Sequence, residues 1–286
     1  MTYPTQAMVQ TETMHFTTHP LRGRQILQEK AHDHLTPEQR QQVKDEGAVI
    51  QPEAVEIPRA IRIDLHCHSV ASHDSVTALD AIPERCAERN IQVLALTDHD
   101  AIWGAQALQQ IVPHSKNPSL TVIVGEEIST SAGELIGLFL KEKVAPGRSP
   151  RETIQAIKSQ GGLVLLPHGF DPLRVALDAE IREEISQSID IVETFNARVA
   201  RRHWNRLADE WSEKHGMLKS AGSDAHLLSE IGSAWVEVPA RPVQTPEDLR
   251  LALQDGVPMG TWRHPLFSYF YSYLERFYLK LKTVFS

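Results

Sequence analysis

The sequence has few cysteines, no long apolar run and no excess of basic residues. Only Cys67 and Cys86 occur among its 286 residues, so no disulfide framework is indicated and a reducing, cytoplasmic location is expected. The absence of any run of 18 apolar residues argues against a membrane-spanning helix, and the first residues do not have the pattern of a secretory signal. The net charge of −8 argues against the broad basic surface that stable binding of duplex nucleic acid requires.

Three regions of different composition follow one another along the chain. Residues 1–60 are polar, and we expect a partly ordered extension there. Residues 61–262 alternate short apolar runs with amphipathic stretches, which favours a closed α/β barrel over an open sheet. The predicted strands are 61–65, 92–96, 121–124, 135–140, 163–166, 189–193, 218–221 and 234–238, and the predicted helices are 78–89, 103–112, 150–159, 178–186, 199–215 and 246–254.

The third region, residues 263–286, is rich in aromatic residues. Eight of the 18 aromatic residues lie in the last 20 positions. Spacings of one, three and four place the apolar side chains of this region on one face of a helix. We expect this amphipathic helix to pack against the barrel or to form a homodimer. The alternative is contact with a membrane surface, because aromatic residues are mixed there with Lys and Arg.

A pair of histidines stands at the end of the first predicted strand, in Asp64-Leu65-His66-Cys67-His68. Side chains alternate along a strand, so His66 and His68 face the same side. Two imidazoles at a strand tip can hold one metal ion, and Asp64 could orient one of them. Taken alone, the pair is equally compatible with two surface histidines.

Four more apolar runs end in the same chemistry. They lead into Thr97-Asp98-His99-Asp100, Gly125-Glu126-Glu127, Pro167-His168-Gly169 and Ser223-Asp224-Ala225-His226. Functional residues of α/β barrels gather at the carboxyl ends of the strands, so five segments are predicted to converge on one metal site. Imidazole and carboxylate ligands without cysteine indicate Zn²⁺, Mn²⁺ or Fe.

Taken in order, these segments resemble the motifs of the PHP (polymerase and histidinol phosphatase) family of metal-dependent phosphoesterases. The motifs are Asp-Leu-His-Cys-His-Ser (64–69), Thr-Asp-His-Asp (97–100), Gly-Glu-Glu-Ile-Ser-Thr (125–130), Pro-His-Gly-Phe-Asp (167–171) and Gly-Ser-Asp-Ala-His (222–226). The resemblance covers residues 61–262. It implies a distorted (β/α)₇ TIM-like barrel with two or three divalent metal ions at one mouth.

The resemblance also implies a set of ligands, drawn from all five motifs and the loop after the first. They are His66, His68, Glu127 and Asp224 for the first metal, Glu127 and His168 for the second, and Asp74, His99 and His226 for the third. Glu127 is preferred over Glu126 because the family pattern is Gly-x-Glu-Ile-Ser.

The sequence departs from the family pattern at two of these positions. Glu134 stands where many relatives have a histidine that binds the second metal, and a carboxylate there would favour a harder ion such as Mn²⁺. One residue is inserted before Asp74, which leaves His73 as an alternative ligand.

The implied activity is hydrolysis of a phosphate ester by a metal-bridged hydroxide. The predicted catalytic residues are Asp224, His99 and His226, of which either histidine could protonate the leaving group. Arg174 and Arg198 follow strand ends and are predicted to hold the phosphate. The alternative for each is a surface arginine.

Asn196 is a further candidate for substrate contact, and its alternative role is to cap the following helix. The expected substrate is a small phosphomonoester or phosphodiester, such as a nucleotide or a short oligonucleotide. Two other readings stay open. One is a non-catalytic metal-binding PHP-type barrel that serves as a structural or interaction module. The other is an amidohydrolase-type metal hydrolase, since such barrels also begin with a His-x-His strand tip.

Overall fold

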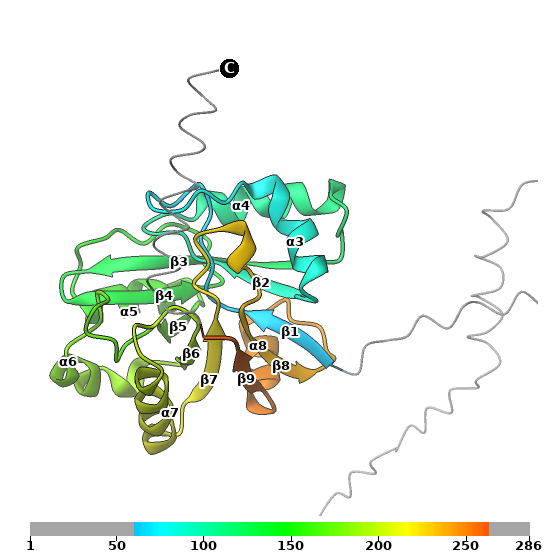
Figure 1. Ribbon diagram of the computed structural model, residues 1–286. Coiled ribbons are helices and arrows are strands. Elements are labelled where there is room, and N and C mark those ends of the chain that lie inside the picture. Colours follow the sequence, from blue (N-terminus) through cyan, green and yellow to red (C-terminus); the bar gives the residue numbers. More distant parts are fainter. Residues whose placement is uncertain (1–59, 263–286) are drawn as a thin grey trace, which may run out of the picture. The chain divides into compact units, whose positions relative to one another are not determined.

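A computed structural model describes residues 60–262 of the chain (Figure 1). The predicted N-terminal extension and the predicted C-terminal helix lie outside the described residues, so both stay predictions. Within residues 60–262, no helix is long and apolar enough to cross a membrane. Cys67 and Cys86 are both buried and neither forms a disulfide.

The described residues contain one mixed sheet in the order β7-β6-β5-β4-β3-β2-β1-β8-β9, which curves into a nearly closed barrel. Parallel pairing joins β1 to β2, β2 to β3, β5 to β6 and β6 to β7, and the other four neighbouring pairs are antiparallel. The strands are β1 (Ala60–Asp64), β2 (Val93–Leu96), β3 (Thr121–Thr130), β4 (Gly133–Leu138), β5 (Leu163–Leu166), β6 (Ile191–Asn196), β7 (Leu218–Gly222), β8 (Ala234–Pro239) and β9 (Val257–Gly260).

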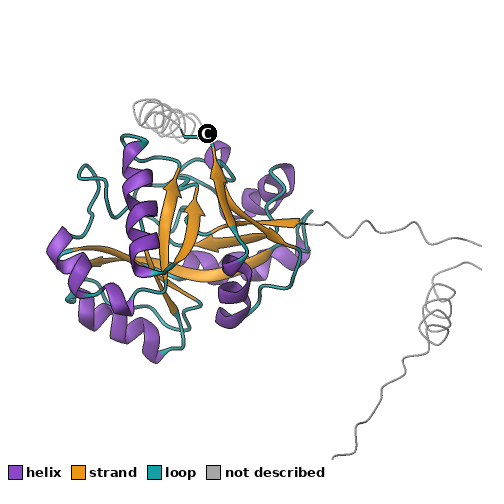
Figure 2. Cartoon of the chain, turned by 90° about the horizontal axis from the view of Figure 1, so that it is seen from below, coloured by secondary structure: helices purple, strands orange, loops and turns teal. Residues whose placement is uncertain are grey.

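Helices surround the outside of this sheet (Figure 2). Two of them begin at capping boxes, built by Ser149 with Glu152 and by Thr245 with Asp248, and both have proline at the first helical position. The helices are α3 (Ile82–Glu88), α4 (Trp103–Ile111), α5 (Pro150–Ser159), α6 (Ala179–Glu184), α7 (His203–His215) and α8 (Pro246–Gln254).

Apolar side chains are buried on both faces of the sheet. On β2, Leu94 and Leu96 belong to the cluster packed under the outer helices, whereas Val93 and Ala95 belong to a second cluster shared by several other strands. This double burial explains why the strand reads as an uninterrupted apolar run. Because both faces of the sheet are covered by apolar side chains, polar side chains gather at the carboxyl ends of the strands.

The barrel closes where the chain just after β1 meets the end of β7 and the residues that follow it. Leu65 N donates to Ala221 O at 3.3 Å, Asp224 N to His66 O at 2.8 Å, and His68 N to Ala225 O at 2.9 Å. The closing contacts therefore lie within the segments that carry the predicted metal ligands. We call this set of hydrogen bonds the seam.

The expected fold class is confirmed, and the differences have local causes. Only residues 131–132 separate β3 from β4, too few for a crossover helix, so these strands form an antiparallel hairpin. Strand β9 was not predicted from the sequence, because Pro258 and Gly260 weaken its strand signal.

Candidate metal centre

All nine predicted metal ligands lie together at one end of the barrel, where most of them follow the carboxyl ends of strands and Glu134 stands near the start of the antiparallel strand β4. Four groups can be drawn in which one nitrogen or oxygen of each residue lies within 4.8 Å of the others. The groups share members: four residues, His66, His68, His99 and Glu127, each occur in two of them. They are His68, Asp74, His99 and His226; His66, His168 and Asp224; His66, His68 and Glu127; and His99, Glu127 and Glu134.

The first position is formed by His66, His68, Glu127 and Asp224. The Nε2 atoms of His66 and His68 are 3.1 Å apart and lie 3.1 and 3.2 Å from Glu127 Oε2. Asp224 Oδ1 lies 3.8 Å from His66 Nε2 and 3.6 Å from His68 Nε2. Ligand bonds of about 2.1 Å place neighbouring ligands roughly 3.0 Å apart in an octahedron and roughly 3.4 Å apart in a tetrahedron. His66, His68 and Glu127 therefore have the spacing of ligands to one divalent ion, and Asp224 lies beside the two histidines.

Asp224 provides a second sign of this fit. Its Oδ1 atom is buried and has no hydrogen-bond partner among the described residues. Four nitrogens surround this oxygen at 3.5–3.8 Å, from His66, His68, Arg198 and His226. A buried carboxylate oxygen normally accepts hydrogen bonds, so this oxygen has the surroundings of a ligand atom.

Charge at the first position favours a cation. Burial opposes protonation of His66, but the carboxylates of Glu127, Glu193 and Asp224 raise its pKa well above the usual range. Burial likewise opposes ionisation of Glu127, yet His66 and His99 hold its pKa well below the usual range. A divalent ion would supply the positive charge that these buried carboxylates attract.

Glu127 extends the centre to a second position through its other oxygen. His168 Nε2 lies 2.9 Å from Glu127 Oε1, whereas His66 and His68 face Oε2. Glu134 lies beside this position, with its carboxylate oxygens 3.8 Å from His168 Nε2 and 3.7 Å from His99 Nδ1. Burial and the neighbouring Glu127 raise the pKa of Glu134 to about 7. Glu127 thus has the arrangement of a bridging carboxylate.

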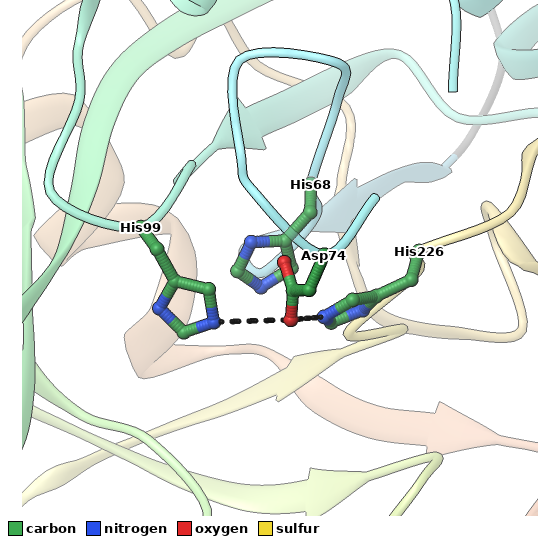
Figure 3. A group of neighbouring side chains, drawn as sticks. All are labelled: His68, Asp74, His99 and His226. Atoms are coloured by element: carbon green, nitrogen blue, oxygen red, sulfur yellow. Dashed lines mark hydrogen bonds and ion pairs between the residues drawn. The ribbon is translucent and has the colours of Figure 1, made fainter. Parts of the chain in front are cut away.

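The third position is formed by Asp74, His99, His226 and His68 (Figure 3). Asp74 Oδ2 lies between two histidines, 2.8 Å from His226 Nε2 and 3.5 Å from His99 Nε2. His73 belongs to none of the four groups, although its ring centre lies 5.4 Å from that of His99. Of the two alternatives left by the inserted residue, the structure brings Asp74 into the cluster.

Two of the ligands have unusual backbone conformations. His168 and Asp224 have φ angles of +25° and +51°, in a region that residues other than glycine seldom occupy. Such conformations persist where the surroundings enforce them, and they are concentrated at functional sites. Here they turn both side chains from the strand ends toward Glu127 and His66.

The predicted substrate residues lie around Asp224. Arg174 Nη2 donates to Asp224 Oδ2, and Arg198 Nη1 donates to Asp224 O at 2.9 Å. The Nδ2 atom of Asn196 donates to Asp224 Oδ2 at 3.2 Å. Asn196 does not cap the following helix, because α7 begins at His203. The side chain of Arg174 is 17% exposed and that of Arg198 only 6%, so Arg174 is the more accessible to a ligand.

One buried residue of the site was missed by the sequence reasoning. Glu193, on β6, is 1% exposed. Its Oε1 lies 3.0 Å from His66 Nδ1, and its Oε2 accepts hydrogen bonds from His168 N at 2.7 Å and Asn196 Nδ2 at 3.0 Å. In a regular strand Glu193 and Asn196 would face opposite sides, so alternation gave no signal for Glu193.

Sequence comparison matches residues 202–258 to the family model described as PHP-associated. An uncharacterized protein of Methanocaldococcus jannaschii is 32% identical over 193 residues, which cover 66% of this chain and 75% of that protein. A 5'-3' exoribonuclease of Haemophilus influenzae is 39% identical over 132 residues, which cover 42% of this chain and 47% of that enzyme.

Comparison of folds agrees with the sequence matches. A two-domain protein of Bacteroides vulgatus that contains a predicted PHP-like metal-dependent phosphoesterase aligns with a TM-score of 0.59 at 16% identity. The alignment covers 71% of this chain and 65% of that structure. At such identity the likeness concerns the fold alone. Together with the sequence relatives and the clustered His, Asp and Glu side chains, it leads to one assignment: the chain belongs to the PHP family of metal-dependent phosphoesterases.

Proposed function

We propose that this protein hydrolyses a phosphodiester or phosphomonoester of a nucleotide or a short oligonucleotide. The observation that carries the proposal is the set of overlapping ligand groups in which Glu127 faces two positions at once. Adjacent divalent ions are the arrangement that serves in-line displacement at phosphorus. The relative named as an exoribonuclease supports a nucleic-acid substrate, but the chain spans only 47% of that enzyme.

Nine residues would hold the ions, which we expect to be Zn²⁺, Mn²⁺ or Fe: His66, His68, Asp74, His99, Glu127, Glu134, His168, Asp224 and His226. When bound, the ions would neutralise the phosphoryl oxygens and make water nucleophilic at neutral pH.

The side chains around the ions divide the remaining tasks. Arg174 reaches Asp224 from the more exposed side, so its guanidinium is placed to hold a phosphate oxygen. Arg198 is nearly buried and contacts both Asp224 and His226, so it would orient these two residues. His99 is more exposed than His226, at 14% against 6% of the side chain. When the third position holds no ion, His99 would therefore be the better placed of the two to give a proton to a leaving group.

The test is a screen of metal-replete protein against three matched substrates: a nucleoside monophosphate, a cyclic or dinucleotide diester, and a short single-stranded RNA. Each reaction is repeated with Asp224→Asn, which removes a ligand charge at nearly constant side-chain volume. Hydrolysis by the wild type and its loss in the variant are the expected result. Stoichiometric metal with no turnover of any of the three substrates would contradict the proposal and favour a non-catalytic metal-binding barrel or an amidohydrolase-type enzyme.

A further inference from the structure

We propose that Glu193 is a positioning residue that fixes the proton of His66 on Nδ1 and holds the backbone of His168. One carboxylate would thereby prepare both metal positions that Glu127 bridges. The inference rests on the metal centre of the proposed function and not on its substrate.

A β-bulge turns Glu193 toward the centre. The register between β6 and β7 passes from Glu193 opposite Ser220 to Phe195 opposite Ala221, so Thr194 is the extra residue. The bulge places Glu193 and Asn196, three positions apart, on the same side of the strand, where Asn196 Nδ2 donates to Glu193 Oε2 at 3.0 Å.

Both groups that contact Glu193 Oε2 can only donate hydrogen bonds. They are the backbone N–H of His168, at 2.7 Å, and the amide group of Asn196. The orientation of the Asn196 amide is set by its other end, because Oδ1 accepts from Arg198 N at 2.8 Å. Oε2 can therefore only accept hydrogen bonds, and the second carboxylate oxygen is left for His66.

Oε1 decides which nitrogen of His66 carries the proton. A carboxylate oxygen only accepts, so the contact of 3.0 Å requires a proton on His66 Nδ1. Without an ion, Nε2 is protonated as well, because it faces the Glu127 carboxylate at 3.1 Å. A bound ion would displace the proton of Nε2 and not that of Nδ1, so the lone pair of Nε2 would be the one directed at the ion between His68 and Glu127. This is the tautomer that a histidine needs in order to bind a metal through Nε2.

The same carboxylate supports His168 on the far side of Glu127. The φ angle of +25° at His168 is unfavourable for a residue with a side chain. A charge-assisted hydrogen bond to its backbone N–H offsets part of that cost. It keeps His168 Nε2 within 2.9 Å of Glu127 Oε1.

Glu193→Gln tests the inference because it changes hydrogen-bonding capacity and hardly changes shape. The amide oxygen must face His168 N and Asn196, which leaves the NH₂ group facing His66 Nδ1. A donor there forces Nδ1 to accept, so the proton moves to Nε2 and blocks the metal-binding lone pair. Loss of such an outer hydrogen bond lowers metal affinity by about 10–100-fold.

Glu126→Gln is the matched control. Glu126 is also fully buried and is adjacent to a predicted ligand, but its Oε2 accepts from Val144 N at 2.8 Å. Glutamine can still accept from this N–H, and the group lies outside the four ligand groups. The control therefore reports the general effect of replacing a buried carboxyl group by an amide.

The experiment uses the full chain loaded with Zn²⁺, with affinity measured by chelator competition and tautomers by NMR of ¹⁵N-labelled imidazoles. The His66 signals are assigned from their loss in His66→Asn. We expect Nδ1–H in the wild type and in Glu126→Gln, with equal affinities. Glu193→Gln should show Nε2–H and an affinity lower by about 10–100-fold.

Unchanged affinity together with Nδ1–H in Glu193→Gln would overturn the inference. So would Nε2–H in the wild type, a measurement that stands even if the variant fails to fold. Absence of phosphoesterase activity, with the metal and tautomer results as expected, would contradict the proposed function and support the role of Glu193.

Discussion

Adding one methyl group at Gly222 should disable the centre without replacing a ligand. Gly222 ends β7 and is buried. A Cβ atom there would meet Glu193 Oε1 and the Cβ atom of His66 far inside the 3.0 Å that real Cβ contacts keep. Neither neighbour has room to withdraw, since Glu193 is 1% exposed and His66 is fully buried. Ordinary contact distances would require a displacement on the order of 1 Å.

A displacement of that size has two separable consequences. Misplacing a group at the reacting centre by 1 Å can lower kcat/KM by about 10²-fold. Overpacking a buried site typically lowers the free energy of unfolding by about 1–3 kcal/mol. Gly222→Ala should therefore show weaker metal binding, a lower rate and moderately reduced thermal stability.

Gly216→Ala separates the two consequences. Gly216 lies at the end of α7 with a φ angle of +63°, and its added Cβ would meet nothing within 4 Å. This variant should lose about 1 kcal/mol of stability from backbone strain and keep its metal affinity. Steady-state kinetics, chelator competition and thermal unfolding of both variants decide the matter. Normal affinity and turnover in Gly222→Ala would refute the steric reasoning.

Three further substitutions probe the individual roles. His168→Ala should lower kcat by about 10²–10³-fold at fixed metal occupancy, because several kcal/mol of charge stabilisation are lost while the fold survives; turnover close to that of the wild type would contradict this. Glu134→His should shift the metal-activity profile from Mn²⁺ toward Zn²⁺, and an unchanged profile would show that Glu134 binds no metal. Arg174→Ala should raise KM for the phosphate ester at least about tenfold, as expected for a lost hydrogen bond between charged groups, and an unchanged KM would remove Arg174 from the substrate site.

Helices and strands were predicted most accurately from the sequence where capping residues or an apolar run mark their ends. The predicted helices 150–159 and 246–254 match α5 and α8, since Ser149 and Thr245 supply capping boxes in front of proline. Strand 163–166 matches β5, an apolar run buried on both faces. By contrast, the predicted helix 199–215 begins only at His203.

The site could be predicted as far as its ligands follow strand ends. Strand periodicity put His66 and His68 on one side, and the structure brings both to Glu127. Glu193 was not predicted to belong to the site, because the β-bulge that turns it inward has no sequence signal as strong as strand alternation. The positions of Arg174 and Arg198 could not be derived either, because long side chains reach partners that only the tertiary fold brings near.

The seam between the ends of β1 and β7 has a consequence for how the molecule opens. His66 and Asp224 lie on opposite sides of it, and the neighbouring pair Asp64 and Ser223 is 159 positions apart in sequence. An ion coordinated from both sides would close a loop of the chain that contains most of the barrel. Closing this loop would exclude conformations in which the two sides of the seam are apart. Amide hydrogen exchange at His68 and Asp224 should therefore depend on metal far more than exchange in β5, and a chelated protein should open at this junction before it unfolds elsewhere.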